Sequence, residues 1–143
     1  MTGVVIDTSA LLAYFKGEAG AEIVHAYTVD QVPLHLSLVN LAEASAWFVR
    51  NGFEADEPLR YAVALGIQLQ DLAPIDAVEI GRMTLFTRNV GLSLGDRACI
   101  TLGFRLNVPV LTADRVWSDT LDWTKYQALQ MKSPVGMRII QIR

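Results

Sequence analysis

The sequence predicts an α/β fold built on a mainly parallel sheet that is flanked by helices. Short apolar runs rich in β-branched residues alternate with longer segments whose apolar residues recur at helical spacing. Residues that start and stop helices separate these segments. The 143 residues contain no repeat, low-complexity tract or linker, so we expect one domain over residues 1–143 with a core of its own.

Capping residues define the elements expected in the first half of the chain. Gly3 and Asp7 bound a buried strand, and Asp7 also offers the N-cap of a helix that Gly17 closes. Ser37 caps a long helix that stops at Asn51. The expected elements are a strand at 3–7, helices at 7–15 and 19–28, a strand at 33–36 and a helix at 37–50.

The second half continues the same alternation. A helix over 55–67 is expected to bury an apolar face, and Pro74 and Ser93 mark the starts of two further helices. The apolar face expected for the first of these comprises Ala55, Leu59, Ala62, Val63 and Leu65. The remaining elements are a strand at 68–73, a helix from 74 to about 91, a helix from 93 to about 106, and strands at 108–111 and 137–142.

The composition is apolar for a small domain. The chain is 52% hydrophobic and 19% charged, and surplus apolar surface on a small protein indicates a subunit interface or a partner. Charged residues interrupt every apolar run before it is long enough to span a bilayer, and no basic leader precedes the first apolar run. We therefore expect a cytoplasmic protein without a membrane segment. The lone cysteine, Cys99, excludes an internal disulfide and is expected in the core.

Four carboxylates stand out because each falls beside or within an apolar segment. Asp7 follows the first strand, Glu43 lies inside a helix, Asp96 opens a helix and Asp114 follows a late strand. Acidic side chains rarely enter such surroundings unless something compensates their desolvation. One hard divalent cation shared by oxygen ligands would do so, which points to metal-dependent phosphoryl chemistry.

The same four residues also have plainer interpretations. Asp7 and Asp96 can be ordinary helix-start residues, and Asp114 can be a turn residue. Glu43 is the hardest to explain in this way, because its helix is apolar around it. Asp7 and Asp114 are expected to converge, since ligands of parallel sheets bind at the carboxyl ends of strands.

Other catalytic patterns are missing from the sequence. His25 and His35 are isolated and are better explained as core or surface residues. The segment that begins at Gly91 lacks the Lys-Ser/Thr ending of a phosphate-binding loop. The net charge of −3 argues against tight electrostatic wrapping of nucleic acid. The four carboxylates together carry −4, however, so the rest of the chain has a net charge of about +1. Weak or transient contact with RNA is compatible with that balance.

Four segments, in order, resemble the PIN-domain ribonucleases, and most of all the VapC-type toxins of bacterial toxin–antitoxin pairs. They are VVIDTSALLA at 4–13, SLVNLAEA at 37–44, LSLGDRACI at 92–100 and VLTADRVW at 110–117. The resemblance implies a three-layer fold, Mg²⁺ or Mn²⁺ as cofactor, endonucleolytic cleavage of RNA, a homodimer and neutralisation by a cognate antitoxin.

The resemblance also implies roles for particular residues. The catalytic and metal-binding quartet would be Asp7, Glu43, Asp96 and Asp114. Thr8, Ser9 and Thr112 match polar positions around the metal, and Asp119 lies where some members carry a further acidic residue or where a surface helix cap would stand.

Arginines and tryptophans near these segments have open roles. Arg97 and Arg115 each follow one of the acids, so they either bind RNA phosphate or pair with neighbouring carboxylates. Trp117 is expected to pack beneath its loop, and Trp47 to lie in the core or an interface.

Two functions other than a toxin remain open from the sequence. One is a PIN-type nuclease that acts in RNA processing, or on structured DNA, without an antitoxin. The other is a non-catalytic PIN-fold binding module, which the presence of all four acids disfavours, because an inactive site gains nothing from clustered like charges.

Overall fold

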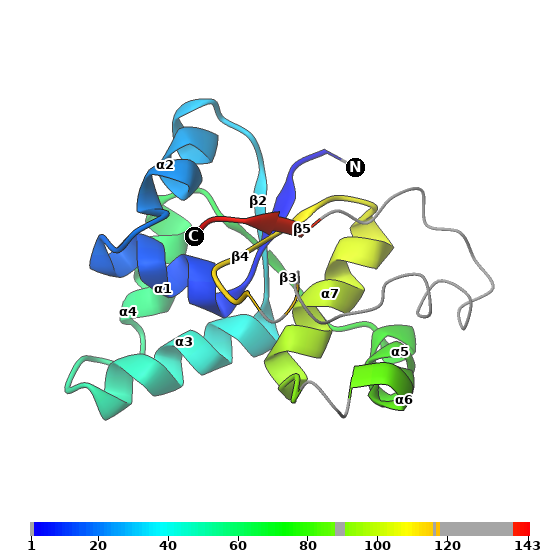
Figure 1. Ribbon diagram of the computed structural model, residues 1–143. Helices are drawn as coiled ribbons and strands as arrows, with labels where there is room; N and C mark the ends of the chain where they lie inside the picture. Colours follow the sequence, from blue (N-terminus) through cyan, green and yellow to red (C-terminus); the bar gives the residue numbers. More distant parts are fainter. Residues whose placement is uncertain (1, 88–90, 116, 118–138) are drawn as a thin grey trace.

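The computed structural model describes residues 2–87, 91–115, 117 and 139–143 (Figure 1). Its centre is a five-stranded sheet with the order β3-β2-β1-β4-β5, and every pair of neighbouring strands is parallel. The strands are short: β1 Val4–Ile6, β2 Leu34–Ser37, β3 Gln68–Gln70, β4 Val110–Thr112 and β5 Ile139–Gln141. This confirms the α/β fold with a parallel sheet.

Helices connect the strands, and most begin where the capping residues predict. Asp7, Ser37 and Ser93 each cap a helix with a side-chain oxygen, and Gly17 ends the first helix in the left-handed conformation. The described helices are α1 Thr8–Lys16, α2 Ala21–Val29, α3 Leu38–Arg50, α4 Glu57–Ala64, α5 Pro74–Arg82, α6 Thr84–Thr87 and α7 Leu94–Leu106.

Alternation along the strands divides the core between the two faces of the sheet. Val4 and Ile6 of β1 pack into one apolar cluster with α1, α2, α3 and α4, whereas Val5 packs into a second cluster with α7. Met83 and Trp117 complete the second cluster. Helices therefore cover both faces, and the molecule has three layers (Figure 1).

The order of the strands determines where a site can form. The chain leaves β1 toward β2 and β3 on one side, and later fills the other side with β4 and β5. The switch point thus lies between β1 and β4, at whose carboxyl ends open parallel sheets bind their ligands. Asp7 follows β1 and Asp114 follows β4, so both lie at this switch point.

The helix expected over 55–67 is shorter than predicted and buries a different face. It spans Glu57–Ala64, and its buried residues are Pro58 and Ala62. Leu59, Val63 and Leu65 are 39%, 63% and 37% exposed, so the prediction that they form the buried face was wrong. The apolar periodicity was real, but it marks a surface rather than the core.

Other boundaries also differ from the prediction. The helix that begins at Pro74 ends at Arg82 instead of near Gly91, and the separate helix α6 follows it. The strand expected over 68–73 is only Gln68–Gln70. Among the described residues, no helix is both long enough and apolar enough to cross a bilayer.

Candidate active site

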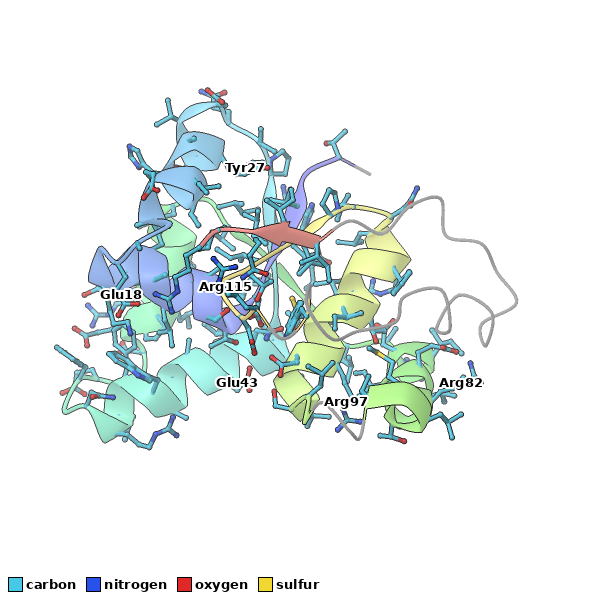
Figure 2. All side chains as sticks on the ribbon, in the orientation of Figure 1. Glu18, Tyr27, Glu43, Arg82, Arg97 and Arg115 are labelled. Carbon is cyan, nitrogen blue, oxygen red and sulfur yellow. The ribbon has the colours of Figure 1, made fainter. Side chains whose placement is uncertain are left out.

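All four predicted carboxylates line one cleft of about 270 Å³ at the switch point. Asp7 comes from the end of β1, Glu43 from α3, Asp96 from the first turn of α7 and Asp114 from the segment after β4. Figure 2 shows the labelled Glu43 pointing into the space between α3 and the start of α7. The cleft therefore joins the four segments, which lie far apart in the sequence.

Asp7 is the deepest of the four. Its side chain is 1% exposed, and its Oδ2 accepts hydrogen bonds from Ser9 Oγ at 2.6 Å and Thr112 Oγ1 at 3.0 Å. Its other oxygen, Oδ1, is buried without a hydrogen-bond partner among the described residues. Burial, reinforced by the charge of Asp96, raises the pKa of Asp7 to about 7 despite the bonds from Ser9 and Thr112.

A polar network that joins α1, α3 and α7 orients Glu43. Thr8 Oγ1 donates to Glu43 Oε1 at 2.8 Å, and Asn40 Nδ2 donates to the same oxygen at 3.3 Å. The Asn40 amide is fully buried, and it also donates to Thr8 Oγ1 at 2.9 Å and to the Gly95 carbonyl at 3.1 Å. Asn40 thereby connects α1, α3 and α7 at the point where three of the four acids enter the cleft.

Asp96 is held by the start of its own helix. Its Oδ2 accepts from the Ser93 backbone N–H at 2.9 Å, while Ser93 Oγ accepts from the Asp96 backbone N–H at 3.1 Å. Partial burial raises the pKa of Asp96, and the charges of Glu43 and Asp114 raise it further against the bonds from Ser93. These like-charge effects show that the acids sense one another across the cleft.

Hydroxyl groups hold the strand ends beside the acids. Ser9 Oγ accepts from the Ala113 backbone N–H at 3.0 Å, and Thr112 Oγ1 accepts from the Asp114 backbone N–H at 3.0 Å. Because both hydroxyls also donate to Asp7, they tie the end of β1 to the turn that carries Asp114. Thr8, Ser9 and Thr112 therefore position the acids directly.

A divalent cation fits this donor set, although the side chains stand apart. Within the ranges that the structure describes, no three His, Cys, Asp or Glu side chains converge tightly enough to hold a metal ion as they stand. Asp7, Glu43 and Asp96 turn toward hydroxyl, amide and backbone donors, and such a spacing reduces the repulsion among like charges. The orphaned Asp7 Oδ1 and the all-oxygen chemistry of the cleft are what Mg²⁺ or Mn²⁺ would satisfy.

Gly95 leaves the space that the Glu43 carboxylate occupies. A Cβ added to Gly95 would overlap the Glu43 carboxyl group, so only glycine at this position leaves Glu43 where it lies. Cys99 lies one turn further along α7, fully buried beneath the cleft. Burial raises the pKa of its thiol, and the charge of Asp7 adds to the effect. Cys99 is therefore the neutral core residue that the sequence predicts.

Replacing Gly95 with alanine is expected to reduce cleavage at least tenfold without unfolding the protein. Alanine favours the helix by about 1 kcal/mol, while the overlap forces the flexible end of Glu43 away from the cleft. Gly81→Ala in α5 is the matched control, because a Cβ there meets no atom within 4 Å. Rates at saturating metal, together with melting curves, check this. Equal rates in both variants would mean that the position of Glu43 does not matter.

The structure separates the two arginines that follow the acids. Arg97 points away from Glu43, toward α5, where its Nη1 donates to the Ile80 carbonyl at 3.0 Å (Figure 2). Arg97 thus ties α7 to α5, and it forms no ion pair with a carboxylate among the described residues. A contact of Arg97 with RNA phosphate stays a prediction. Arg115 is exposed after Asp114. Trp117 is completely buried in the second core cluster, which confirms that it packs beneath its loop. Asp119 lies outside the described residues.

Sequence reasoning missed Asn40 and Gly95, which contact Glu43, and Arg50, which lines the cleft. Asn40 was detectable as a polar side chain in an apolar helix, three positions before Glu43. Gly95 was detectable because glycine destabilises a helix, so its presence in the first turn indicates a close contact there. Trp47 and Arg50 also line the cleft. Trp47 was expected in the core or an interface, but it is half-buried in the cleft wall.

Several solved structures share this architecture. A toxin–antitoxin complex from Klebsiella pneumoniae matches with a TM-score of 0.60 and 15% identity, over 82% of this chain and 92% of that one. VapBC2 from Rickettsia felis, bound to a fragment of promoter DNA, matches with a TM-score of 0.65 and 10% identity, over 96% and 97%. DNA-bound VapBC from Salmonella typhimurium matches with a TM-score of 0.62 and 13% identity, over the full length of both chains. At these identities the likeness concerns the fold.

The sequence itself carries the family assignment. No curated protein matches the chain. Residues 4–120, however, match the PIN domain, and this range contains all four acids of the cleft. The chain therefore belongs to the PIN domain family.

Proposed function

We propose that this chain is a metal-dependent endoribonuclease that hydrolyses RNA phosphodiester bonds and acts as a VapC-type toxin. The observation that carries the proposal is the meeting of Asp7, Glu43, Asp96 and Asp114 in one cleft, where a buried Asp7 oxygen has no hydrogen-bond partner among the residues that the structure describes. A cleft of this kind is costly without a cation, and membership of the PIN domain family supports a nuclease.

Each acid has a defined part in this proposal. Asp7 and Asp96, the two whose pKa values are raised, would hold Mg²⁺ or Mn²⁺ together with Glu43 and Asp114. A bound divalent cation would lower the pKa of water and neutralise charge on the scissile phosphate. Thr8 and Asn40 keep one oxygen of Glu43 occupied, so that the carboxylate meets the cleft in one orientation.

The direct test is cleavage of single-stranded RNA by the purified chain. Cleavage is expected with added Mg²⁺ or Mn²⁺ and is expected to stop with a chelator. A map of cut sites in total RNA after brief expression would identify the target. Undiminished cleavage in the chelator would refute the metal-dependent mechanism.

A cognate antitoxin is the proposed partner. The similar structures from Klebsiella pneumoniae, Rickettsia felis and Salmonella typhimurium are toxin–antitoxin complexes or VapBC assemblies, which supports this choice. An antitoxin arginine that pairs with Glu43 or Asp96 would compete with the cation for the same oxygens. Inhibition should then weaken as Mg²⁺ or Mn²⁺ rises.

Growth distinguishes a toxin from a processing nuclease. We expect expression of this chain alone, in the bacterial cytoplasm where we place it, to arrest growth, and a small DNA-binding protein to be encoded directly upstream. Normal growth with abundant folded wild-type protein would instead favour a PIN nuclease of RNA processing. The presence of four acids in one cleft argues against a non-catalytic module.

We further propose that the chain forms a homodimer through α3 and α4. Apolar side chains are exposed along these helices and the segment between them, more than a monomer needs to expose. They are Val49, Phe53, Leu59, Tyr61, Val63 and Leu65. Light scattering is expected to show a dimer at micromolar concentration.

A pair of matched substitutions tests that interface. Val63 and Val29 are 63% and 64% exposed, but only Val63 lies on α4. Val63→Glu should therefore produce monomers, whereas Val29→Glu should not. A monomeric wild-type protein would contradict the proposed dimer.

A further inference from the structure

Helix α3 turns one stripe of side chains toward the cleft. Asn40, Glu43, Trp47 and Arg50 recur at spacings of three and four residues, which places them on one face. The last three of these line the same cleft as the other acids. At 1.5 Å per residue, Trp47 lies about 6 Å and Arg50 about 10 Å from Glu43 along the helix axis. The stripe thus leads outward from the acidic floor to an aromatic and a basic residue.

Helix α1 forms the opposite wall of this outward path. It runs beside α3 away from the sheet edge, and Leu12 lines the cleft between them (Figure 1). At its end, Lys16 Nζ lies 4.9 Å from the centre of the Trp47 ring and 2.6 Å from Glu18 Oε1. Phe48 and Phe53 also pack against the indole, with ring centroids 5.5 and 6.5 Å from that of Trp47, so these rings and Lys16 together hold Trp47 at the wall of the cleft.

Arg50 supplies a second cation at this end of the cleft. It is exposed, and among the described residues it makes no ion pair or side-chain hydrogen bond. A guanidinium that is not committed to a carboxylate, beside a cleft whose floor is acidic, has the right chemistry for a phosphate group. Arg50 thus makes this end of the cleft basic, whereas the floor is acidic, and Glu18 offsets the charge of Lys16.

We propose that Trp47 and Arg50 form a substrate ledge, on which an unpaired base of single-stranded RNA stacks against Trp47 while Arg50 binds a neighbouring phosphate. The inference rests on the proposed nuclease function and adds to it the residues that hold the RNA outside the acidic floor. Aromatic side chains bind splayed bases of single strands, and duplex bases are not available for such stacking. The uncommitted guanidinium of Arg50 favours a polyanion over an apolar peptide as the occupant of this end of the cleft.

The first test measures affinity without cleavage. A fluorescein-labelled, single-stranded RNA twelve nucleotides long is titrated, in Mg²⁺, with Asp96→Asn protein and with the same protein carrying Trp47→Leu. The second substitution is expected to weaken binding about tenfold, and Trp47→Phe should recover most of the loss. Tyr27→Leu is the control, because Figure 2 places Tyr27 at the far end of the molecule from Glu43. In the cleaving protein, Trp47→Leu should raise KM by a similar factor and leave kcat nearly unchanged.

Abasic RNA assigns the contact to a base. With Trp47 present, removal of one particular base along the strand should weaken binding about tenfold. With Trp47→Leu, removal of the same base should have no further effect, since the base and the indole act as a pair. If the loss of affinity from removing the base and the loss from Trp47→Leu add up in the doubly changed complex, the stacking assignment is overturned. This holds even if Trp47→Leu weakens binding by altering the fold.

Salt dependence tests the phosphate contact. Arg50→Gln should reduce the slope of log affinity against log salt concentration by about 0.7, the value for one phosphate contact on a single strand. Arg60→Gln is the control, because Arg60 is an exposed arginine on α4 that already pairs with Asp56. An unchanged slope for Arg50→Gln would overturn its proposed role.

The outcomes separate this inference from the proposed function. If neither protein binds RNA and the wild-type chain does not cleave it, the nuclease function itself fails. If RNA is bound and cut but Trp47→Leu changes neither affinity nor KM, only the ledge fails. A Trp47→Leu effect that is confined to the antitoxin complex would make the ledge a protein-docking surface and would overturn the RNA assignment.

Discussion

Replacing Asp96 with asparagine is expected to lower the rate of RNA cleavage by about 100- to 1,000-fold. The amide keeps the shape of the side chain, and its oxygen can still accept from the Ser93 backbone N–H that starts α7. What it removes is the negative charge that would hold a cation and that Glu43 and Asp114 sense across the cleft. Initial rates on the mapped RNA target, with melting curves as the check on folding, measure the effect.

Asp30→Asn provides the matched control for that substitution. Asp30 is an exposed acid at the end of α2. It lies shortly before the start of β2, whereas the cleft lies at the carboxyl ends of the strands. It should cleave RNA at the wild-type rate and arrest growth in cells, whereas Asp96→Asn should do neither. Full activity of a folded Asp96→Asn protein would remove Asp96 from the catalytic site.

Replacing Asp7 with asparagine is expected to stabilise the metal-free protein at pH 8 while it abolishes cleavage. Asp7 has a pKa of about 7 in the fold and of 3.8 without the fold's influence, so its charge opposes folding. The penalty is absent below about pH 4, grows as the pH rises and is complete above about pH 7, where it reaches about 4 kcal/mol. The Asp7→Asn variant would bury a side-chain N–H group without a partner, which cancels part of this gain and leaves a net stabilisation of about 2 kcal/mol.

Urea unfolding in a chelator, between pH 5.5 and 8.5, measures that change. The wild-type free energy of unfolding should fall by about 2 kcal/mol across this range, and the Asp7→Asn variant should lose much less. Asp76→Asn is the control with the opposite sign, because buried Asp76 pairs with Arg105 at 3.0 Å. Loss of this ion pair in Asp76→Asn should lower the free energy of unfolding. A wild-type protein more stable at pH 8.5 than at pH 5.5 would contradict the cost assigned to Asp7.

Local signals in the sequence were sufficient for the architecture around the site. Asp7, Ser37 and Ser93 cap their helices as predicted, because capping depends on one side chain and the backbone next to it. The placement of Asp7 and Asp114 also followed, since parallel strands bring their carboxyl ends to one edge. The confirmed parts therefore depend on short-range chemistry and on topology.

The errors arise where tertiary or quaternary packing decides. Apolar spacing alone could not tell whether Leu59 and Val63 face the core or an exposed surface, and they face the surface. Sequence adjacency placed Arg97 with Asp96, but successive helical residues point in different directions, and Arg97 reaches Ile80 instead. The Asn40 network and the fit of Gly95 against Glu43 depend on contacts between helices, which no single segment reveals.

The most direct test of the central claim is the position of manganese in crystals soaked with Mn²⁺. Anomalous scattering locates the metal independently of any assay of activity. The account predicts manganese in the cleft, bound by oxygens of Asp7 and Asp96 with Glu43 or Asp114, and with the orphaned Asp7 Oδ1 among its ligands. Manganese bound elsewhere, with this cleft empty, would contradict it.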